Sequence, residues 1–374
     1  MANLNRQASE LTQSDVRSLK LTLADQLFAI ARSDHERASR ELALVVEVFE
    51  NLGAEFANTA KQLQATIKPG AAAADITVKK LIKEQDIRGF AATQLTPDMV
   101  SSIARGFAAY LMETNPGKKN LTIVVGGDAR VSTPYVTDDV IQTLKALGVD
   151  VININVPYAS TPEFYFASDF LNADAGIMIT ASHLEPEYNG MKFVVRVPGN
   201  NGSTKIENIS AKDLTAYFSG ATGQVRELAS LGSVTLRSVR QDYADHIAGV
   251  ITKGVVEASN QAKPLIGKTI ALDIGNGASS AMVALLENLG AKVIALFPEA
   301  DGTFPNHIAD PSKEDNMRDL MAAVVANQAD FGIGFDSDGD RSGFVTNAGR
   351  MFGGNELLML LAKSRLNSQA YLDK

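Results

Sequence analysis

Two stretches of the chain, residues 121–152 and 269–296, repeat the same order of elements. In each stretch an apolar run is followed by a glycine-containing turn, a helical pattern and a second apolar run. The helical patterns end at Leu147-Gly148 and at Leu289-Gly290, and glycine is a common residue just after a helix. Short apolar strands that alternate with helices are typical of parallel or mixed sheets covered on both faces. We therefore expect an α/β protein built from repeated α/β domains.

The second repeat contains Gly275-Asn276-Gly277, which matches the start of a dinucleotide-binding fingerprint. The third glycine of that fingerprint is absent, because residue 280 is a serine. We therefore set a dinucleotide site aside. Ligands of open α/β sheets bind beyond the carboxyl ends of the strands, so polar residues that follow apolar runs are the better candidates.

The loop that follows the apolar run at 176–179 carries a hydroxyl and an imidazole, on Ser182 and His183. An ammonium group follows at Lys192, just before another apolar run at 193–195. A hydroxyl, an imidazole and an ammonium on one anchored loop suit phosphoryl transfer. A Ser-His pair on a loop is common, however, and by itself indicates little.

A second loop, after the apolar run at 331–334, has three aspartates at alternate positions: Asp336, Asp338 and Asp340. Gly339 lets the backbone curl so that the carboxylates converge, and hard oxygen ligands suit Mg²⁺ or Ca²⁺. An EF-hand is excluded, because its pattern needs glycine and glutamate where the chain has Arg341 and Asn347. The alternative is a solvated acidic turn, but the position after a strand and the following arginine favour a metal site.

These two loops resemble those of the α-D-phosphohexomutase family, the phosphomannomutases and phosphoglucomutases. The family's serine loop runs Thr-Ala/Gly-Ser-His-Asn-Pro, and its metal loop runs Asp-x-Asp-x-Asp-Arg. The resemblance extends in order from about Asp86 to about Leu366. Further segments similar to family signatures are 86–89, 127–132, 156–162, 273–277 and 304–307.

The resemblance implies a role for each residue of the two loops. Ser182 would carry a phosphoryl group. The three aspartates Asp336, Asp338 and Asp340 would hold Mg²⁺, with an oxygen on the phosphorylated Ser182 as a further ligand. Arg341 would contact the same phosphate. Metal and cationic side chains would then stabilise the negative charge of the phosphoryl transition state.

Three more residues would surround the reacting hydroxyl as acid/base and electrostatic partners: His183, Lys192 and Arg88. A lysine close to other cations loses basicity, so we expect Lys192 to carry protons near neutral pH. The structural alternatives are that Arg88 forms a salt bridge between domains and that Lys192 is a solvated strand residue.

The chain departs from the family pattern at several places. Leu184-Glu185 stands where the family has Asn-Pro, and leucine has no polar group with which to hold the loop. Gln85 replaces an aromatic residue before the 86–89 signature. The family has four domains, and the sugar-recognition loop of its third and the phosphate-binding loop of its fourth do not occur here. We therefore expect a protein truncated after the start of domain three.

The resemblance and the composition shifts together predict four parts. They are a helical extension and linker at 1–84, a first family domain with the serine loop at 85–230, a second with the metal loop at 231–346, and an incomplete third at 347–374. Within the extension, apolar residues from Leu42 to Phe56 fall at helical spacing, and residues 68–74 resemble a linker. The helices would either pack on the body of the protein or support self-association.

The charge and composition exclude several classes of function. A net charge of −8 without a basic cluster argues against nucleic acid as a partner. The chain has no cysteine, which excludes disulfides and thiol catalysis. It shows no signal peptide and no apolar run long enough to span a membrane. We expect a cytoplasmic protein.

The family resemblance implies an isomerase that interconverts hexose 1-phosphate and hexose 6-phosphate, of mannose or of glucose. Its cofactor would be Mg²⁺, its activator hexose 1,6-bisphosphate, and its partners small hexose phosphates. Three alternatives stay open: a truncated, non-catalytic relic of the family, a metal-dependent phosphatase that transfers the serine phosphate to water, and a partner-binding module built on the amino-terminal helices.

Overall fold

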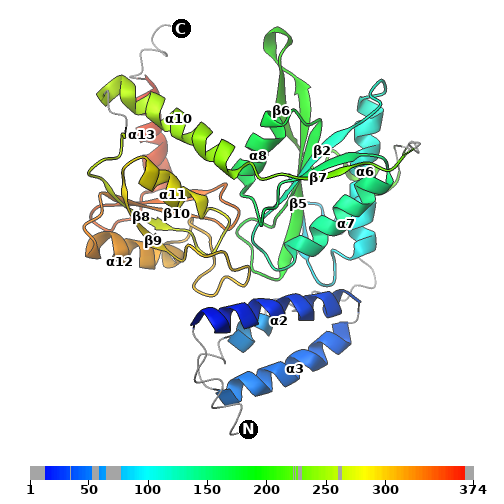
Figure 1. Cartoon of the computed structure of the whole chain (residues 1–374), viewed down its shortest axis with the longest axis horizontal. Coiled ribbons are helices and arrows are strands. Elements are labelled where there is room, and N and C mark those ends of the chain that lie inside the picture. Colours follow the sequence, from blue (N-terminus) through cyan, green and yellow to red (C-terminus); the bar gives the residue numbers. More distant parts are fainter. Residues whose placement is uncertain are drawn as a thin grey trace.

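The computed structural model describes residues 13–33, 35–52, 59–64, 77–221, 223, 225, 230–259 and 263–366. These residues form two α/β domains and a helical bundle that lies against both of them (Figure 1). The linker expected at 68–74 lies outside the described residues.

The larger domain is built on a mixed sheet with strand order β1-β5-β4-β2-β3-β7, and β6 also pairs with β5. The strands are β1 (Ile87–Phe90), β2 (Thr122–Gly127), β3 (Asp150–Asn153), β4 (Ala175–Ile179), β5 (Tyr188–Pro198), β6 (Thr204–Ile209) and β7 (Val234–Leu236). Strands β2, β3, β4 and β7 are parallel, whereas β5 is antiparallel to β1, β4 and β6. Because β7 pairs with β3, this sheet continues past the domain boundary expected near residue 230.

Helices cover both faces of this sheet, as the apolar runs predicted. They are α6 (Pro97–Thr114) and α7 (Thr133–Ala146) on one face and α8 (Thr161–Phe170) on the other. In β2, Ile123 and Val125 belong to the cluster under α6 and α7, and Val124 belongs to the cluster under α8. This two-sided burial explains why the strand reads as a continuous apolar run rather than as an alternating one.

The smaller domain has a sheet with order β11-β10-β8-β9. Its strands are β8 (Thr269–Asp273), β9 (Lys292–Leu296), β10 (Phe331–Phe335) and β11 (Ser342–Thr346). Strand β8 is parallel to β9 and β10, and β11 is antiparallel to β10. Two helices pack on its opposite faces, α11 (Ala281–Asn288) and α12 (Arg318–Ala326).

The two predicted repeats are confirmed in these sheets, since β2-α7-β3 and β8-α11-β9 are equivalent units. The two glycines that follow the helices, Gly148 and Gly290, have φ of 75° and 100°. Most residues with a side chain avoid that left-handed region, so glycine ends each helix at little steric cost.

The remaining elements connect or flank the two domains. They are α5 (Val78–Leu81), η2 (Asn200–Gly202), α9 (Thr215–Phe218), α10 (Arg240–Ser259), η3 (Glu314–Met317) and α13 (Gly354–Leu366). Leu358 and Leu361 of α13 are more than half exposed, so this helix packs loosely on the described body. None of the helices in the described part of the chain has the length and apolar character required to span a membrane.

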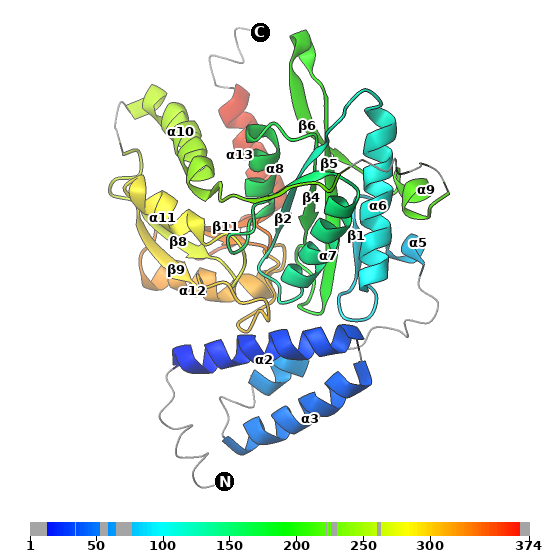
Figure 2. The same cartoon turned by 45° about the vertical axis from the view of Figure 1, so that its right-hand side comes forward.

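The amino-terminal region forms a helical bundle, which Figure 2 shows beneath both domains. It comprises α2 (Gln13–Ser33), α3 (His35–Leu52) and a short helix at 59–64. Its core includes Phe28 and Leu63 together with Ala91 and Ala92 of the larger domain. The helices therefore pack on the body of the protein, while self-association stays a prediction.

We expect Gly190→Ala to destabilise the larger domain strongly. A Cβ atom at Gly190 would lie 2.0 Å from the carbonyl oxygen of Ile87 on the paired strand β1, and backbone cannot move aside cheaply. Overpacking of this kind costs about 3 kcal/mol of unfolding free energy, to be measured by denaturant titration.

The matched control is Gly249→Ala on α10, where no atom lies within 4 Å of the added Cβ. Alanine in a helix interior is favoured over glycine by about 0.5–1 kcal/mol, so this variant should be neutral or stabilised. Equal unfolding free energies for the two variants would contradict the tight pairing of β1 and β5.

Candidate active site

The serine loop begins where β4 ends in the larger sheet. Ser182 is fully buried and has φ of 53°, a left-handed conformation that is uncommon for serine. Its backbone N–H donates to the Thr180 hydroxyl at 2.8 Å, and that hydroxyl donates to Asp128 at 2.8 Å. The turn, with its uncommon backbone conformation, is thus held by side-chain hydrogen bonds.

Arg130, which is almost fully buried, holds the rest of the serine loop. Its guanidinium donates to the carbonyl oxygens of Ser182, Leu184, Glu185 and Tyr188. The leucine that replaces the family's asparagine therefore still takes part in anchoring the loop, but through its backbone carbonyl. The planar fork of arginine suits this multiple contact, which lysine could not reproduce.

Lys192 is not on the loop itself, as the sequence layout suggested, but inside β5. It lies opposite Met178 of β4 in the antiparallel pair. A strand holds the side chain more rigidly than a loop, so its ammonium has a well-defined position beside the serine loop.

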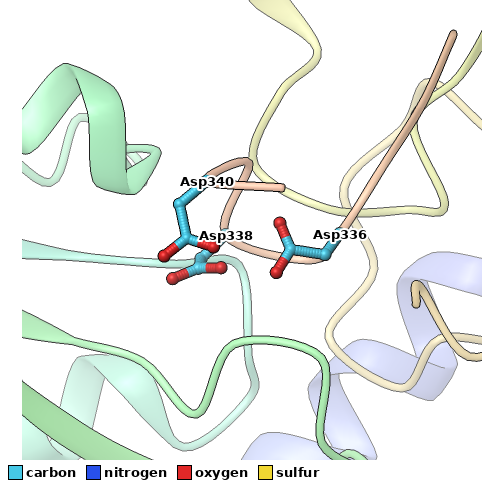
Figure 3. Close-up of side chains that lie close together, drawn as sticks. All are labelled: Asp336, Asp338 and Asp340. Atoms are coloured by element: carbon cyan, nitrogen blue, oxygen red, sulfur yellow. The ribbon is translucent and has the colours of Figure 1, made fainter. Parts of the chain in front are cut away.

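The metal loop begins where β10 ends in the smaller sheet. One carboxylate oxygen from each of Asp336, Asp338 and Asp340 lies within 4.8 Å of the others (Figure 3). Gly339 has φ of 76° and provides the curl that the sequence predicted. Gly277 of the neighbouring turn also matters, since an added Cβ would lie 2.7 Å from the Ser337 carbonyl oxygen.

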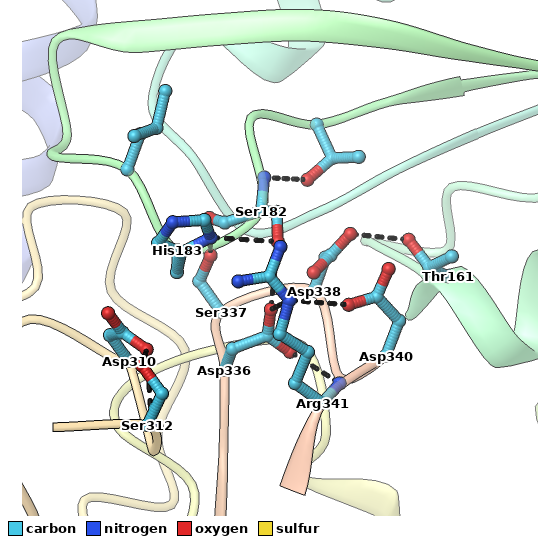
Figure 4. A network of polar contacts seen from close by, with 12 residues as sticks. Thr161, Ser182, His183, Asp310, Ser312, Asp336, Ser337, Asp338, Asp340 and Arg341 are labelled. Atoms are coloured by element: carbon cyan, nitrogen blue, oxygen red, sulfur yellow. Dashed lines mark hydrogen bonds and ion pairs between the residues drawn. The ribbon is translucent and has the colours of Figure 1, made fainter. Parts of the chain in front are cut away.

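The two loops meet directly although they come from different domains (Figure 4). The Ser182 hydroxyl donates to Asp336 Oδ2 at 2.9 Å, and the Ser337 hydroxyl donates to the Ser182 carbonyl oxygen. Thr161, at the start of α8, donates to Asp338 Oδ2 at 2.6 Å. The structure thus brings together the predicted nucleophile and the predicted metal ligands.

The chemistry of the aspartates fits a hard divalent cation. Within the described part of the chain, no hydrogen-bond donor reaches Asp338 Oδ1, although that atom is buried. A buried carboxylate oxygen without a partner carries a high desolvation cost, which a cation would offset. Three converging carboxylates beside a hydroxyl match the oxygen ligands that Mg²⁺ prefers.

Lys192 balances part of this negative charge. Its ammonium lies 2.7 Å from Asp338 Oδ2 and 2.6 Å from Asp340 Oδ2. Burial lowers the pKa of Lys192, but the two aspartates outweigh burial and raise it above its ordinary value. The expectation that Lys192 loses basicity was therefore wrong, because its nearest charges are carboxylates rather than cations.

The pKa values of the two buried aspartates, Asp336 and Asp338, are shifted in opposite directions. Burial and the charges of Asp338 and Asp340 raise the pKa of Asp336. Burial also acts to raise the pKa of Asp338, but the charge and hydrogen bond of Lys192 lower it below its ordinary value. Without a cation, a proton on Asp336 therefore relieves the repulsion within the cluster.

His183 lies beside the reactive hydroxyl, with Nδ1 3.3 Å from Ser182 Oγ. Burial and the positive charges of Arg341 and Arg88 lower the pKa of His183, although Asp310 opposes them. The imidazole therefore stays neutral to lower pH than usual and can accept a proton at neutral pH.

Arg88 and Arg341 border a cavity of about 390 Å³ next to the metal loop, together with Lys192 and Asp340. Arg88 is held by Asp86 at 2.7 Å and by the Ala181 carbonyl oxygen at 3.2 Å. Both partners belong to the larger domain, so these contacts do not form a salt bridge between domains. Arg341 is 42 % exposed, and its Nε lies 3.9 Å from Asp336 Oδ2 and 3.8 Å from Asp340 Oδ1, long ion pairs that allow the guanidinium to bind an anion as well.

No role could be predicted from the sequence for Asp128, Arg130 or Thr161, although the segments that contain them resemble family signatures. Arg130 Nε pairs with Asp128 Oδ2 at 3.0 Å, and both side chains are fully buried. A buried arginine cannot be distinguished from an exposed one in a single sequence. The signal that could have indicated it is the short Asp-x-Arg spacing directly after an apolar strand.

Comparisons with known proteins identify the family of the chain. Residues 79–216 match the family described as "Phosphoglucomutase/phosphomannomutase, alpha/beta/alpha domain I", and residues 241–349 match domain II of the same description. The chain belongs to the phosphoglucomutase/phosphomannomutase family. The resemblance seen in the sequence and the mixed α/β fold are thereby confirmed.

Individual members of this family are similar to the chain over most of its length. A phosphoglucomutase of Neisseria gonorrhoeae is 35 % identical over 295 residues, covering 77 % of this chain and 58 % of the relative. A phosphomannomutase/phosphoglucomutase of Pseudomonas aeruginosa is 33 % identical over 287 residues, covering 76 % and 56 %. The chain thus matches little more than half the length of these curated relatives.

A solved structure of a phosphoglucomutase/phosphomannomutase family protein from Burkholderia thailandensis superimposes with a TM-score of 0.64 at 28 % identity. The match covers 78 % of this chain and 60 % of that structure. Both domains described here therefore have counterparts in the phosphoglucomutase/phosphomannomutase fold.

We expect Mg²⁺ to raise the melting temperature more at about pH 8 than at about pH 5. The proton held by Asp336 stabilises the metal-free protein below the ordinary carboxyl pKa near 4, and this contribution is lost as pH rises through the raised pKa of Asp336. Mg²⁺ takes the place of that proton, so the stabilisation that Mg²⁺ gives increases with pH. Thermal unfolding with Mg²⁺ and with a chelator measures the difference.

The control variant is Asp338→Asn, which should reduce the Mg²⁺-dependent increase at both pH values, because it removes a ligand charge. The same increase at both pH values in the unaltered protein would contradict a metal site that competes with protons.

Proposed function

We propose that the chain carries the phosphoserine and metal centre of a phosphohexomutase, which interconverts hexose 1-phosphate and hexose 6-phosphate. The observation that carries this proposal is the 2.9 Å contact between the Ser182 hydroxyl and Asp336, which joins the two domains at a cluster of three carboxylates. A nucleophile and a cation site within reach of one phosphate are the central requirement of phosphoryl transfer.

Asp336, Asp338 and Asp340 would hold Mg²⁺, with an oxygen of phosphorylated Ser182 as a further ligand. When bound, the ion would offset the negative charge that develops on the transferring phosphoryl group. Two observations support this assignment: among the described residues no donor reaches the buried Asp338 Oδ1, and the three carboxylates converge.

Transfer begins from phosphorylated Ser182. A free hydroxyl of the hexose phosphate forms a bond to phosphorus while the bond between phosphorus and Ser182 Oγ breaks, which gives a hexose bisphosphate. The hydroxyl proton passes to the neutral His183 and from there to Ser182 Oγ, 3.3 Å away. After the sugar turns around, the reverse reaction returns the other phosphoryl group to Ser182.

The cationic residues bind and orient the phosphates. Arg88, Lys192 and Arg341 border the cavity of about 390 Å³ beside the metal loop, a size suited to a small ligand. Lys192 supplies a positive charge here, since its ammonium lies 2.7 Å from Asp338 and 2.6 Å from Asp340 at the edge of the metal loop. In an acidic chain, these local cations are what attracts an anionic sugar phosphate.

A second candidate is a phosphatase in which water replaces the hexose hydroxyl. Asp340 and Arg341 are 26 % and 42 % exposed, so solvent reaches the edge of the site. Release of inorganic phosphate in excess of isomerised hexose would favour this candidate. A folded protein that neither takes up nor releases a phosphoryl group would instead be a non-catalytic relative.

We expect Ser182→Ala to abolish phosphoenzyme formation, because no oxygen remains to accept the phosphoryl group. The protein is incubated with labelled hexose 1,6-bisphosphate and Mg²⁺, and the phosphate is located by mass spectrometry of peptides. Asp338→Asn should keep the site but slow its labelling about 100-fold, the usual effect of removing one electrostatic stabiliser.

Ser219→Ala is the matched control, since Ser219 is an exposed serine at the end of α9. It should be labelled like the unaltered protein. Labelling that persists in Ser182→Ala would place the nucleophile elsewhere, and no labelling of any variant would rule out the phosphoserine reaction.

A further inference from the structure

The helical bundle contacts both domains, and a buried lysine takes part in its contact with the smaller one. Helix α2 runs along both domains in Figures 1 and 2. Lys20 of α2 is 4 % exposed, and its ammonium donates to Asp301 and, at 2.9 Å, to the Thr303 hydroxyl. Gln62 of the short helix accepts from the same ammonium at 3.1 Å. The lysine therefore joins two bundle helices to a turn of the smaller domain.

Other residues of the bundle, most of them on α2, contact the larger domain. Phe28 of α2 packs against Tyr135 of α7 with ring centroids 5.2 Å apart. The Tyr135 hydroxyl donates to the Asp25 carboxylate at 2.6 Å, and Ala91 and Ala92 lie in the bundle core. Because α2 is a continuous helix, it links the two domains through a rigid element.

The turn that Lys20 holds is pressed against the larger domain next to Arg130. Gly302 lies so close that an added Cβ would be 2.4 Å from the Ala129 carbonyl oxygen and 2.4 Å from the Val131 nitrogen. The ring of Phe304 lies under the Arg130 guanidinium, 5.1 Å from its carbon. A displaced turn would therefore disturb the residue that anchors the serine loop.

A buried carboxylate in this turn depends on the lysine. Asp301 is 2 % exposed, and its other oxygen already accepts from the backbone and the hydroxyl of Thr303, at 3.0 and 2.7 Å. Removing the ammonium would leave an uncompensated charge at the interface, a change that buried ion pairs tolerate poorly. The turn would then move toward solvent, away from Arg130.

We propose that Lys20 is a positioning residue for phosphoryl transfer: it fastens the 301–304 turn to a bundle docked on the larger domain and thereby sets the distance between Ser182 and Asp336. The role in transfer rests on the proposed function, whereas the effect on the domain arrangement does not. The reaction needs both loops within bonding reach of one phosphate, and an error of about 1 Å can cost about 100-fold in rate.

The domain arrangement can be measured directly, because the chain has no cysteine. Spin labels are attached at Ala146→Cys on α7 and Ala284→Cys on α11, both exposed helix positions in different domains. The full chain should show one narrow distance distribution. Lys20→Met keeps the aliphatic part of the side chain but removes its charge. It should broaden the distance distribution and slow the uptake of labelled phosphate by Ser182 about 100-fold.

Two further variants separate positioning from folding, and a third is the control. Lys20→Arg keeps the charge and should restore much of the narrow distribution. Thr303→Val alters the contact from the side of the smaller domain and leaves the bundle intact. It removes one hydrogen bond of Lys20 but keeps the Lys20–Asp301 pair, so it should broaden the distribution less than Lys20→Met does. Gln26→Ala, at an exposed position of the same helix, should behave like the unaltered chain.

Narrow, unchanged distributions in both Lys20→Met and Thr303→Val, with unchanged labelling of Ser182, would overturn the proposal. A second outcome separates the two proposals. The distance distribution could depend on Lys20 while neither the unaltered chain nor any variant takes up phosphate at Ser182. The phosphoserine reaction would then be ruled out, and the control of the domain arrangement by Lys20 would stand.

Discussion

The arrangement of this site depends on one buried guanidinium. Arg130 pairs with Asp128 beneath the sheet edge, donates to four carbonyl oxygens of the serine loop, and lies over the ring of Phe304 from the other domain. Its Nη2 also reaches the Ser337 hydroxyl at 3.3 Å. A single planar cation thus binds four carbonyl oxygens of one loop, and it does so at the junction of the two domains.

Next to Arg130, the electrostatics of the site are dominated by repulsion between carboxylates that lie close together. Three aspartates converge, and two of them are fully buried, Asp336 and Asp338. Lys192 compensates part of their charge from a strand of the larger domain. The raised pKa of Asp336 and the lowered pKa of Asp338 show that the compensation is uneven. A divalent cation would complete it, and the same cation would serve a phosphate held by Ser182.

Much of the fold could be predicted, because the strands of the α/β domains are buried on both faces and read as short apolar runs. The glycines after α7 and α11 marked the helix ends, since they take φ values that side chains disfavour. The loops at 180–187 and 336–341 were recognisable because their residue types already specify chemistry. The basicity of Lys192 was predicted wrongly, since a pKa depends on which charges are nearest in space, and spacing along the chain does not reveal them.

The sequence by itself determined local properties: apolar periodicity, helix ends, the curl that Gly339 permits, and the set of groups able to bind a cation or carry a phosphoryl group. Tertiary structure alone decided which of these groups meet. The Ser182 hydroxyl and Asp336 are 154 positions apart in the chain, and Lys20 and Asp301 are 281 apart. The physical reason is that such contacts are selected by packing between domains, where burial, close approach at Gly302 and buried charge pairs act together.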